Sequence, residues 1–317
     1  MMTERQSVMV GICGDSGAGK STYAEALRQL LGPERVSVIA LDDYHSLDRK
    51  ERERVGVTAL HPYKANNLGL LVDHVWSLRR GEAIVKPVYD HRTGTFASPV
   101  VVQPHDIVIL EGLHVLYLER LRSALDLRLY FDTDADLRAQ WKIRRDAGVR
   151  GYTPAAVLAE IERRRPDVER YIEPQKGFAD VVIHYTRDHE TPPTDENPEP
   201  IRVRFAERLT GSKRRLVKWL ALAGSLGLVQ STHFRDEITG HEMEIASLTG
   251  TTKVDALDSL IEMVSDRHLL SEYVARNLTA IQYDPVSVSR ILIASMISLL
   301  EIHADGAPLL AGHRPHG

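Results

Sequence analysis

The chain has 317 residues, enough for one large α/β domain or for two smaller ones with a substantial core. Its hydrophobic content of 43% and charged content of 26% are ordinary for a globular protein, and the formal net charge of −4 argues against a general affinity for nucleic acid or for an anionic membrane. The polar N-terminus predicts no secretory signal, and the longest apolar run, 216–229, is too short to span a bilayer. With a single cysteine, the composition predicts a cytoplasmic protein without an internal disulfide.

The first predicted element is a phosphate-binding loop between a strand and a helix. An apolar strand at 8–12 precedes the pattern G-x-x-x-x-G-K-[ST], and a helix over 22–31 follows it. Such a loop points backbone N–H groups at phosphates, while its lysine reaches the β- and γ-phosphates and its serine hydroxyl ligates Mg²⁺. The loop therefore predicts a nucleoside triphosphate site formed by Gly14, Asp15, Ser16, Gly17, Ala18, Gly19, Lys20, Ser21 and Thr22.

A second strand, 36–41, runs into the polar sequence Asp42-Asp-Tyr-His-Ser-Leu-Asp-Arg49. Ligands in open α/β sheets bind beyond the carboxyl ends of the strands, so these side chains should lie beside the phosphates. Asp42 or Asp43 is placed to act as the general base for an acceptor hydroxyl. Residues 50–55 predict a solvated helix start or a loop, and 67–80 predict an amphipathic helix.

A β-hairpin is predicted next, because two β-rich runs, 83–89 and 95–102, flank the turn sequence Asp90-His-Arg-Thr-Gly94. Three further apolar runs predict buried strands at 107–110, 127–131 and 179–185. The first of these ends in Glu111, where a phosphate-loop protein carries its second metal-associated acid. Support for a metal is thus expected from Ser21, Glu111 and Asp146.

Two helices are predicted between the last two of these strands. One covers 135–145; the other begins at Thr153-Pro154 and should stop at Pro166. Phosphoryl transfer needs positive charge around the transferring group and a site that excludes water. This helix–Gly–helix segment is expected to supply both as a lid, through Lys142, Arg145 and Arg150.

The strand–helix alternation over 1–186 predicts an α/β fold with a mostly parallel sheet flanked by helices, as in a P-loop NTPase of the nucleoside-kinase type. Residues 187–200 are polar and proline-rich, which predicts a loop. We expect 201–305 to form an antiparallel extension packed on the same domain and 306–317 to form a flexible tail. Within the extension, strands are predicted at 201–205 and 241–248 and helices at 213–223, 254–264 and 286–302.

Several long motifs occur in the order found in phosphoribulokinases of the plant and cyanobacterial type, and the chain resembles that family densely over 8–186 and more weakly beyond. These motifs are Asp42–Arg49, Gly56–Pro62, Ala65–Asn67, Lys86–Gly94, Glu111–His114, Trp141–Asp146, Arg150–Tyr152 and Tyr171–Lys176. The resemblance implies transfer of the γ-phosphate of ATP to the C1 hydroxyl of ribulose 5-phosphate, with Mg²⁺, in a homodimer.

The resemblance also implies a role for individual residues. Asp42 matches the base, while Glu111 and Asp146 match carboxylates at the metal–phosphate site. The cations around the transferring phosphoryl group match Lys142, Arg145 and Arg150. The residues that hold the sugar phosphate or line the acceptor pocket match His45, Arg49, Tyr89, His91 and Arg164.

One departure from the family concerns redox control. Chloroplast members form a disulfide between a cysteine in the phosphate loop and one just before the Leu-Asp-Asp-Tyr motif, where this chain has Ala18 and Ala40. The sole cysteine, Cys13, is predicted to be a small buried hydrophobe. Thiol switching by that route is therefore excluded.

Two other functions fit parts of the sequence. A uridine or cytidine kinase shares the phosphate loop and the Arg145-Asp146 pair, but the segments 42–49 and 56–62 look like the ribulose-phosphate pattern. A GTP-dependent switch protein has its best support in Thr252-Lys-Val-Asp255, which lies more than 200 residues beyond the loop. We interpret that tetrapeptide as an ordinary helix entry.

Overall fold

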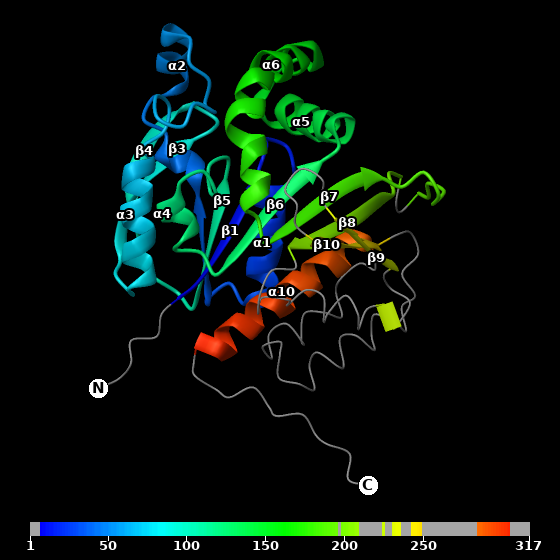
Figure 1. Cartoon of the computed structure of the whole chain (residues 1–317). Helices are drawn as coiled ribbons and strands as arrows, with labels where there is room; N and C mark the ends of the chain where they lie inside the picture. The colour runs from blue at the N-terminus through cyan, green and yellow to red at the C-terminus, as the bar shows by residue number, and fades with distance from the viewer. Residues whose placement is uncertain are drawn as a thin grey trace, which may run out of the picture.

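The computed structural model of the chain describes residues 7–195, 198–208, 224–225, 230–235, 242–248 and 284–304. Their centre is an eight-stranded sheet with the strand order β2-β5-β1-β6-β7-β8-β10-β9 (Figure 1). Its first five strands run parallel, and they are β2 (Val36–Ala40), β5 (Ile107–Gly112), β1 (Val8–Gly14), β6 (Leu127–Thr133) and β7 (Val181–Arg187). These are the continuous apolar runs of the sequence, and every residue of β1 is buried.

Three strands extend this sheet in the antiparallel direction. They are β8 (Ile201–Arg208), β10 (Glu242–Leu248) and β9 (Gln230–Arg235), and β8 joins them to β7. The predicted α/β class with an antiparallel extension is therefore confirmed, although β9 was not among the predicted strands. The predicted helices at 213–223 and 254–264, the tail 306–317 and the tetrapeptide 252–255 lie outside the described residues.

Helices cover both faces of the sheet and enclose two apolar cores. On one face α1 (Lys20–Leu31) packs beside α10 (Pro285–Ala304), and the Tyr23 hydroxyl of α1 donates a 2.9 Å hydrogen bond to the Ser289 carbonyl of α10. On the other face lie α3 (Leu68–Arg79) and the short helix α4 (Glu119–Arg122). Among the described residues, no helix combines the length and apolar character that a membrane span needs.

The predicted hairpin forms a separate two-stranded sheet of β3 (Ile84–Asp90) and β4 (Thr95–Val102). Before it, the chain leaves β2 in a 3₁₀ turn, η1 (Leu41–Tyr44), rather than continuing the strand through Leu41 as predicted. The charged run then forms α2 (Arg49–Val55), because Asp48 and Glu51 make a reciprocal capping box at its start and Gly56 takes φ 68° at its end. Both η1 and α2 thus follow β2 beyond the carboxyl edge of the sheet.

Two helix ends differ from the prediction. The helix predicted over 135–145 continues as α5 (Ala135–Arg150), because the chain turns only at Gly151, whose φ is 72°. The next helix, α6 (Pro154–Asp167), contains Pro166 instead of stopping at it, and the chain continues into a π-helical turn, η2 (Val168–Ile172), and a 3₁₀ turn, η3 (Glu173–Phe178). Pro166 lacks the N–H that would bond to the carbonyl of residue 162, so α6 passes through it with one hydrogen bond fewer, and the α-helical geometry ends one residue later, at Asp167.

Cys13 lies in β1 and is fully buried, as predicted. Its sulfur is 3.2 Å from Gln175 Oε1, and burial raises the pKa of the thiol to about 11. A thiol in this environment is protonated at neutral pH and unreactive. It acts as a packing residue.

Candidate active site

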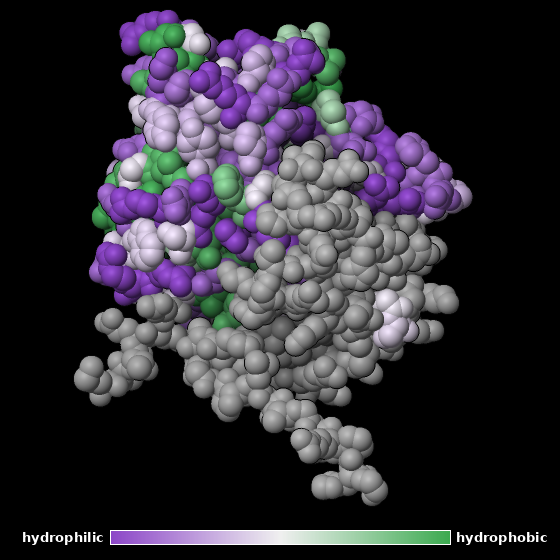
Figure 2. All heavy atoms as spheres, viewed as in Figure 1, coloured by the Kyte–Doolittle hydropathy of each residue, from purple (hydrophilic) through white to green (hydrophobic). Residues whose placement is uncertain are grey.

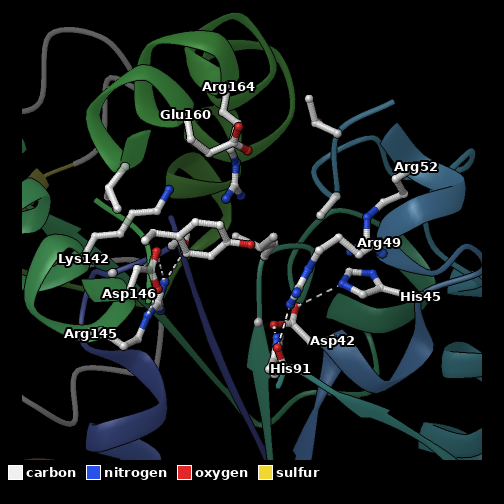
Figure 3. Close-up of a pocket in the computed structure, with 18 of the residues that line it drawn as sticks. Asp42, His45, Arg49, Arg52, His91, Lys142, Arg145, Asp146, Glu160 and Arg164 are labelled. Atoms are coloured by element: carbon white, nitrogen blue, oxygen red, sulfur yellow. Dashed lines mark hydrogen bonds and ion pairs between the residues drawn. The ribbon is translucent and has the colours of Figure 1, made fainter. Parts of the chain in front are cut away.

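A cavity of about 720 Å³ opens at the carboxyl edge of the parallel strands. One wall consists of the phosphate loop with α5 and α6, and the other of η1, α2 and the β3–β4 turn (Figure 3). The surface around α2, α5 and α6 is mostly hydrophilic (Figure 2). Helices α2 and α6 both contribute lining residues, and their ribbons stand apart on the same end of the molecule (Figure 1).

The phosphate loop joins β1 to α1, as the pattern predicts. A Cβ atom at Gly14 would lie 2.5 Å from the Phe131 carbonyl oxygen, and Gly17 has φ 85°, so both positions need glycine. Lys20 donates a 2.7 Å hydrogen bond to the carbonyl oxygen of Asp15 across the loop. Of the nine residues predicted to bind the nucleotide here, Ser16, Gly17, Gly19, Lys20, Ser21 and Thr22 line the cavity, whereas Gly14, Asp15 and Ala18 are not among its lining residues.

Two of the three predicted metal-associated residues touch each other. The Ser21 hydroxyl donates a 3.0 Å hydrogen bond to Glu111 Oε1, and burial raises the pKa of Glu111 despite the nearby positive charge of Lys20. The third, Asp146, lies on α5 and pairs with Arg145 Nε at 2.8 Å. Hydroxyl and carboxylate oxygens suit Mg²⁺, which typically completes its shell with phosphate oxygens and water. The described residues contain no group of three His, Cys, Asp or Glu side chains that could hold a metal by themselves.

Two histidines flank the carboxylate of Asp42. His91 Nε2, from the β3–β4 turn, lies 3.2 Å from Asp42 Oδ2, and His45 Nε2 lies 3.9 Å from Asp42 Oδ1. Burial alone would raise the pKa of Asp42, but the hydrogen bond from His91 and the charges of His45, His91 and Lys20 outweigh it and lower that pKa. The carboxylate is therefore ionised and faces the cavity. Burial lowers the pKa of His45, and Asp42 partly offsets this effect.

Asp43 has different surroundings. Its carboxylate forms an ion pair with Lys86 of β3 and accepts a 2.8 Å hydrogen bond from the backbone N–H of Tyr89. Asp43 is not among the cavity residues, whereas its neighbour Asp42 is. The geometry favours Asp42 as the base.

Two guanidinium groups from α2 line the same cavity as Asp42. Arg49 Nη2 donates a 2.6 Å hydrogen bond to the carbonyl oxygen of His91. Arg52 Nη2 donates a 2.8 Å hydrogen bond to the Tyr89 hydroxyl, which donates in turn to the Gly94 carbonyl at 3.0 Å. Arg52 Nη1 also donates a 2.6 Å hydrogen bond to the carbonyl oxygen of Leu47. Of the five N–H groups of each guanidinium, these bonds use one in Arg49 and two in Arg52, so both side chains keep donors for an anion.

The opposite wall carries further cations on α5 and α6. Burial, followed by the neighbouring charge of Arg164, lowers the pKa of Lys142 to about 8. Burial also lowers the pKa of Arg164, while Asp15 and Glu160 raise it. Lys142 is buried and Arg164 half-buried, and two cations that line one cavity favour the binding of an anion there. Arg150 is the last residue of α5, but its side chain lies outside the described part.

All other predicted catalytic, metal and substrate residues line this one cavity, from seven segments of the chain: Lys20, Ser21, Asp42, His45, Arg49, Tyr89, His91, Glu111, Lys142, Arg145, Asp146 and Arg164. The prediction missed several lining residues, among them Arg52, Glu53, Trp141, Glu160 and Arg163. For two of them the sequence held a clue. Arg52 and Glu53 lie three and four residues after Arg49, so a helix over this segment places them on the same face as that predicted site residue.

The model of the "Phosphoribulokinase / Uridine kinase family" matches residues 9–192. A phosphoribulokinase of Synechocystis sp. is 46% identical over 203 residues, which are 63% of this chain and 60% of that protein. A chloroplastic phosphoribulokinase of Spinacia oleracea is 33% identical over 299 residues, 85% of this chain and 73% of that protein. A uridine kinase of Geobacillus sp. is 37% identical over 184 residues, 56% of this chain and 86% of that protein.

Among solved structures, a phosphoribulokinase from Rhodobacter spheroides superposes with a TM-score of 0.57 at 17% identity, over 92% of this chain and 99% of that one. At this identity the likeness shows a shared fold. The matched region thus spans about three-fifths of the cyanobacterial relative and nearly three-quarters of the spinach one.

Proposed function

The chain belongs to the phosphoribulokinase/uridine kinase family, and from this premise we propose that it transfers the γ-phosphate of ATP to the C1 hydroxyl of D-ribulose 5-phosphate, giving ribulose 1,5-bisphosphate and ADP. One observation supports a phosphorylated sugar as the acceptor. The cavity wall opposite the phosphate loop contains an ionised carboxylate, Asp42, together with two arginines, Arg49 and Arg52. An acceptor that already bears a phosphate dianion needs such donors, whereas a neutral nucleoside does not.

On the donor side, the loop residues Gly14–Ser21 and Thr22 bind the triphosphate of ATP, and Lys20 breaks its bond to Asp15 to reach the β- and γ-phosphates. Ser21, Glu111 and Asp146 would hold Mg²⁺, which neutralises developing charge on the phosphate oxygens when it is bound. Lys142, Arg145 and Arg150 stabilise the transferring group from the lid side, and Arg164 of α6, which lines the same cavity, is a further donor for the sugar phosphate.

On the acceptor side, Asp42 orients the C1 hydroxyl and accepts its proton as the oxygen attacks phosphorus. His91 and His45 hold the carboxylate in place. A carboxylate whose pKa is lowered is a weak base, so orientation of the nucleophile is its larger contribution in a loose phosphoryl-transfer transition state. Arg49 and Arg52 bind the sugar phosphate, and Tyr89 fixes Arg52.

A steady-state assay that compares ribulose 5-phosphate with uridine and cytidine, at equal ATP, tests the proposal. We expect kcat/KM for the sugar phosphate to exceed that for either nucleoside by several orders of magnitude. Phosphorylation of uridine but not of the sugar phosphate would instead make the chain a uridine kinase, which is the runner-up because it shares the donor-side motifs. A homodimer and a cytoplasmic location stay predictions from the resemblance and the composition.

A further inference from the structure

The β3–β4 hairpin contributes to the site without belonging to the main sheet. In the described part of the chain, its two strands pair only with each other. Nevertheless its turn carries His91, which contacts Asp42, and its first strand carries Tyr89, which contacts Arg52. The relative position of the hairpin and η1 therefore decides whether the acceptor side is assembled.

A buried ion pair joins these two elements. Lys86 of β3 contacts Asp43 of η1, and their side chains are only 10% and 13% exposed. The other carboxylate oxygen of Asp43 accepts the backbone N–H of Tyr89 at 2.8 Å, so Asp43 binds β3 at two points three residues apart. The register of β3 with β4 shifts between Lys86 and Val88, which leaves this stretch of β3 irregular and able to turn toward η1.

The consequence follows from the position of Asp43 next to Asp42. With the Asp43 carboxylate held on β3, the Asp42 carboxylate faces the cavity and meets His91, which directly follows the end of β3 and lies five residues after Lys86. Arg49 adds a further link through the His91 carbonyl. Lys86 itself is not placed to contact a substrate, because it does not line the cavity.

We propose that the Lys86–Asp43 ion pair is a positioning device: it holds the β3–β4 hairpin on η1 so that His91 reaches Asp42 and Asp42 is aimed at the acceptor hydroxyl. The proposal rests on the proposed function for its kinetic consequence, but its structural consequence, the His91–Asp42 contact, is independent of the acceptor's identity. Lys86 acts through other residues and touches no reacting atom.

Lys86→Met is the primary test. It should lower kcat at least tenfold and leave the KM for ATP within twofold, because the phosphate loop is not linked to the pair. Arg128→Met is the matched control: it breaks the ion pair between Arg128 of β6 and Asp180, which directly precedes β7, and the two side chains are 23% and 18% exposed. The control should lower the melting temperature without changing kcat.

The double variant Lys86→Met/Asp43→Asn separates positioning from the cost of an unpaired buried charge. It removes that charge and keeps an acceptor for the Tyr89 N–H. We expect its melting temperature to recover while kcat stays low. Recovery of kcat as well would overturn the proposal, because the defect of the single variant would then come from the stranded carboxylate.

Imidazole NMR of ¹⁵N-labelled protein, with the His91 signal assigned through His91→Gln, supplies a readout that needs no acceptor. In Lys86→Met and in the double variant the ¹⁵N chemical shifts of the His91 imidazole should differ from their native values, and in Arg128→Met they should not change. An unchanged His91 signal in a folded Lys86→Met protein would overturn the proposal whatever the acceptor proves to be. Failure of the proposed function would appear separately, as inactivity of the native chain toward ribulose 5-phosphate.

Discussion

Two adjacent acidic residues, Asp42 and Asp43, have different surroundings in the structure, and we assign them different roles. Asp42 faces the cavity between two histidines, whereas Asp43 is engaged by β3. The sequence alone leaves both open as the base, because neighbours at the end of a strand have the same local context. The partner that decides between them, Lys86, is 43 residues away in the chain.

Replacement of the base tests this assignment. Asp42→Asn should lower kcat by about 10²- to 10⁴-fold, since it removes the proton acceptor for the hydroxyl while keeping the side chain's size. The dissociation constant for ATP, measured by calorimetry without acceptor, should stay within a factor of two. Asp106→Asn, which alters an ion pair with Arg35 at the other end of the sheet, serves as the control. A normal kcat for Asp42→Asn would refute the assignment.

The pH profile reports on Lys142. Because its pKa is lowered to about 8, the free enzyme loses this charge as the pH rises through that value, and kcat/KM for ATP should fall about tenfold per pH unit above it. Bound phosphates favour the charged form, so the corresponding fall in kcat should lie at higher pH.

Lys142→Arg checks the origin of that fall. Arginine keeps its proton throughout this range, so the variant should lose the alkaline decline in kcat/KM even if its maximal rate is lower. A decline that persists near pH 8 in Lys142→Arg would assign it to another group.

At the scale of elements, the sequence predicted the strands and the central helices because their apolar residues recur at strand or helix spacing. It was wrong at Leu41 and Pro166. A turn that follows a strand without a change in hydrophobicity gives no signal. A proline usually ends a helix, but Pro166 lies in the last turn of α6, where it removes a single hydrogen bond to the turn before it. The hairpin was predicted, but not its attachment to η1.

The hairpin turn also shapes the position of Arg49. Gly94 has φ 76°, and a Cβ atom there would lie 2.8 Å from Arg49 Cζ. Gly94→Ala should therefore displace this guanidinium and raise the KM for the sugar phosphate about tenfold, the loss expected for one charged hydrogen bond. The measurement is steady-state kinetics with the sugar phosphate varied.

Gly81→Ala provides a matched control for that substitution. Gly81 has φ 79°, nearly the same backbone strain, but a Cβ atom there meets nothing within 4 Å. Both variants should lose about 1–2 kcal/mol of stability from the left-handed conformation, and only Gly94→Ala should change the KM. Equal KM values in the two variants would show that strain alone, not contact with Arg49, explains any loss.

On the scale of the whole molecule, the C-terminal part completes the core that supports the phosphate loop. Val203 and Phe205 of β8, with Ile291, Leu292 and Ile297 of α10, belong to the same buried cluster as the inner face of α1. Composition and spacing predicted that this extension packs on the first 186 residues, but could not show that α10 contacts α1, because that pairing joins segments more than 250 residues apart.

Truncation tests whether the extension is needed for folding. A chain that ends at residue 200 would expose the α1 face and leave β7 as a free edge strand, so we expect it to aggregate or to bind a hydrophobic dye and to lose its cooperative thermal transition. A chain that ends at residue 305 removes only the predicted tail, and it should keep the native melting temperature and activity. Were the shorter chain monomeric, cooperatively folded and able to bind ATP with native affinity, residues 1–186 would be an independent domain, and the extension would be an addition to it and not part of its core.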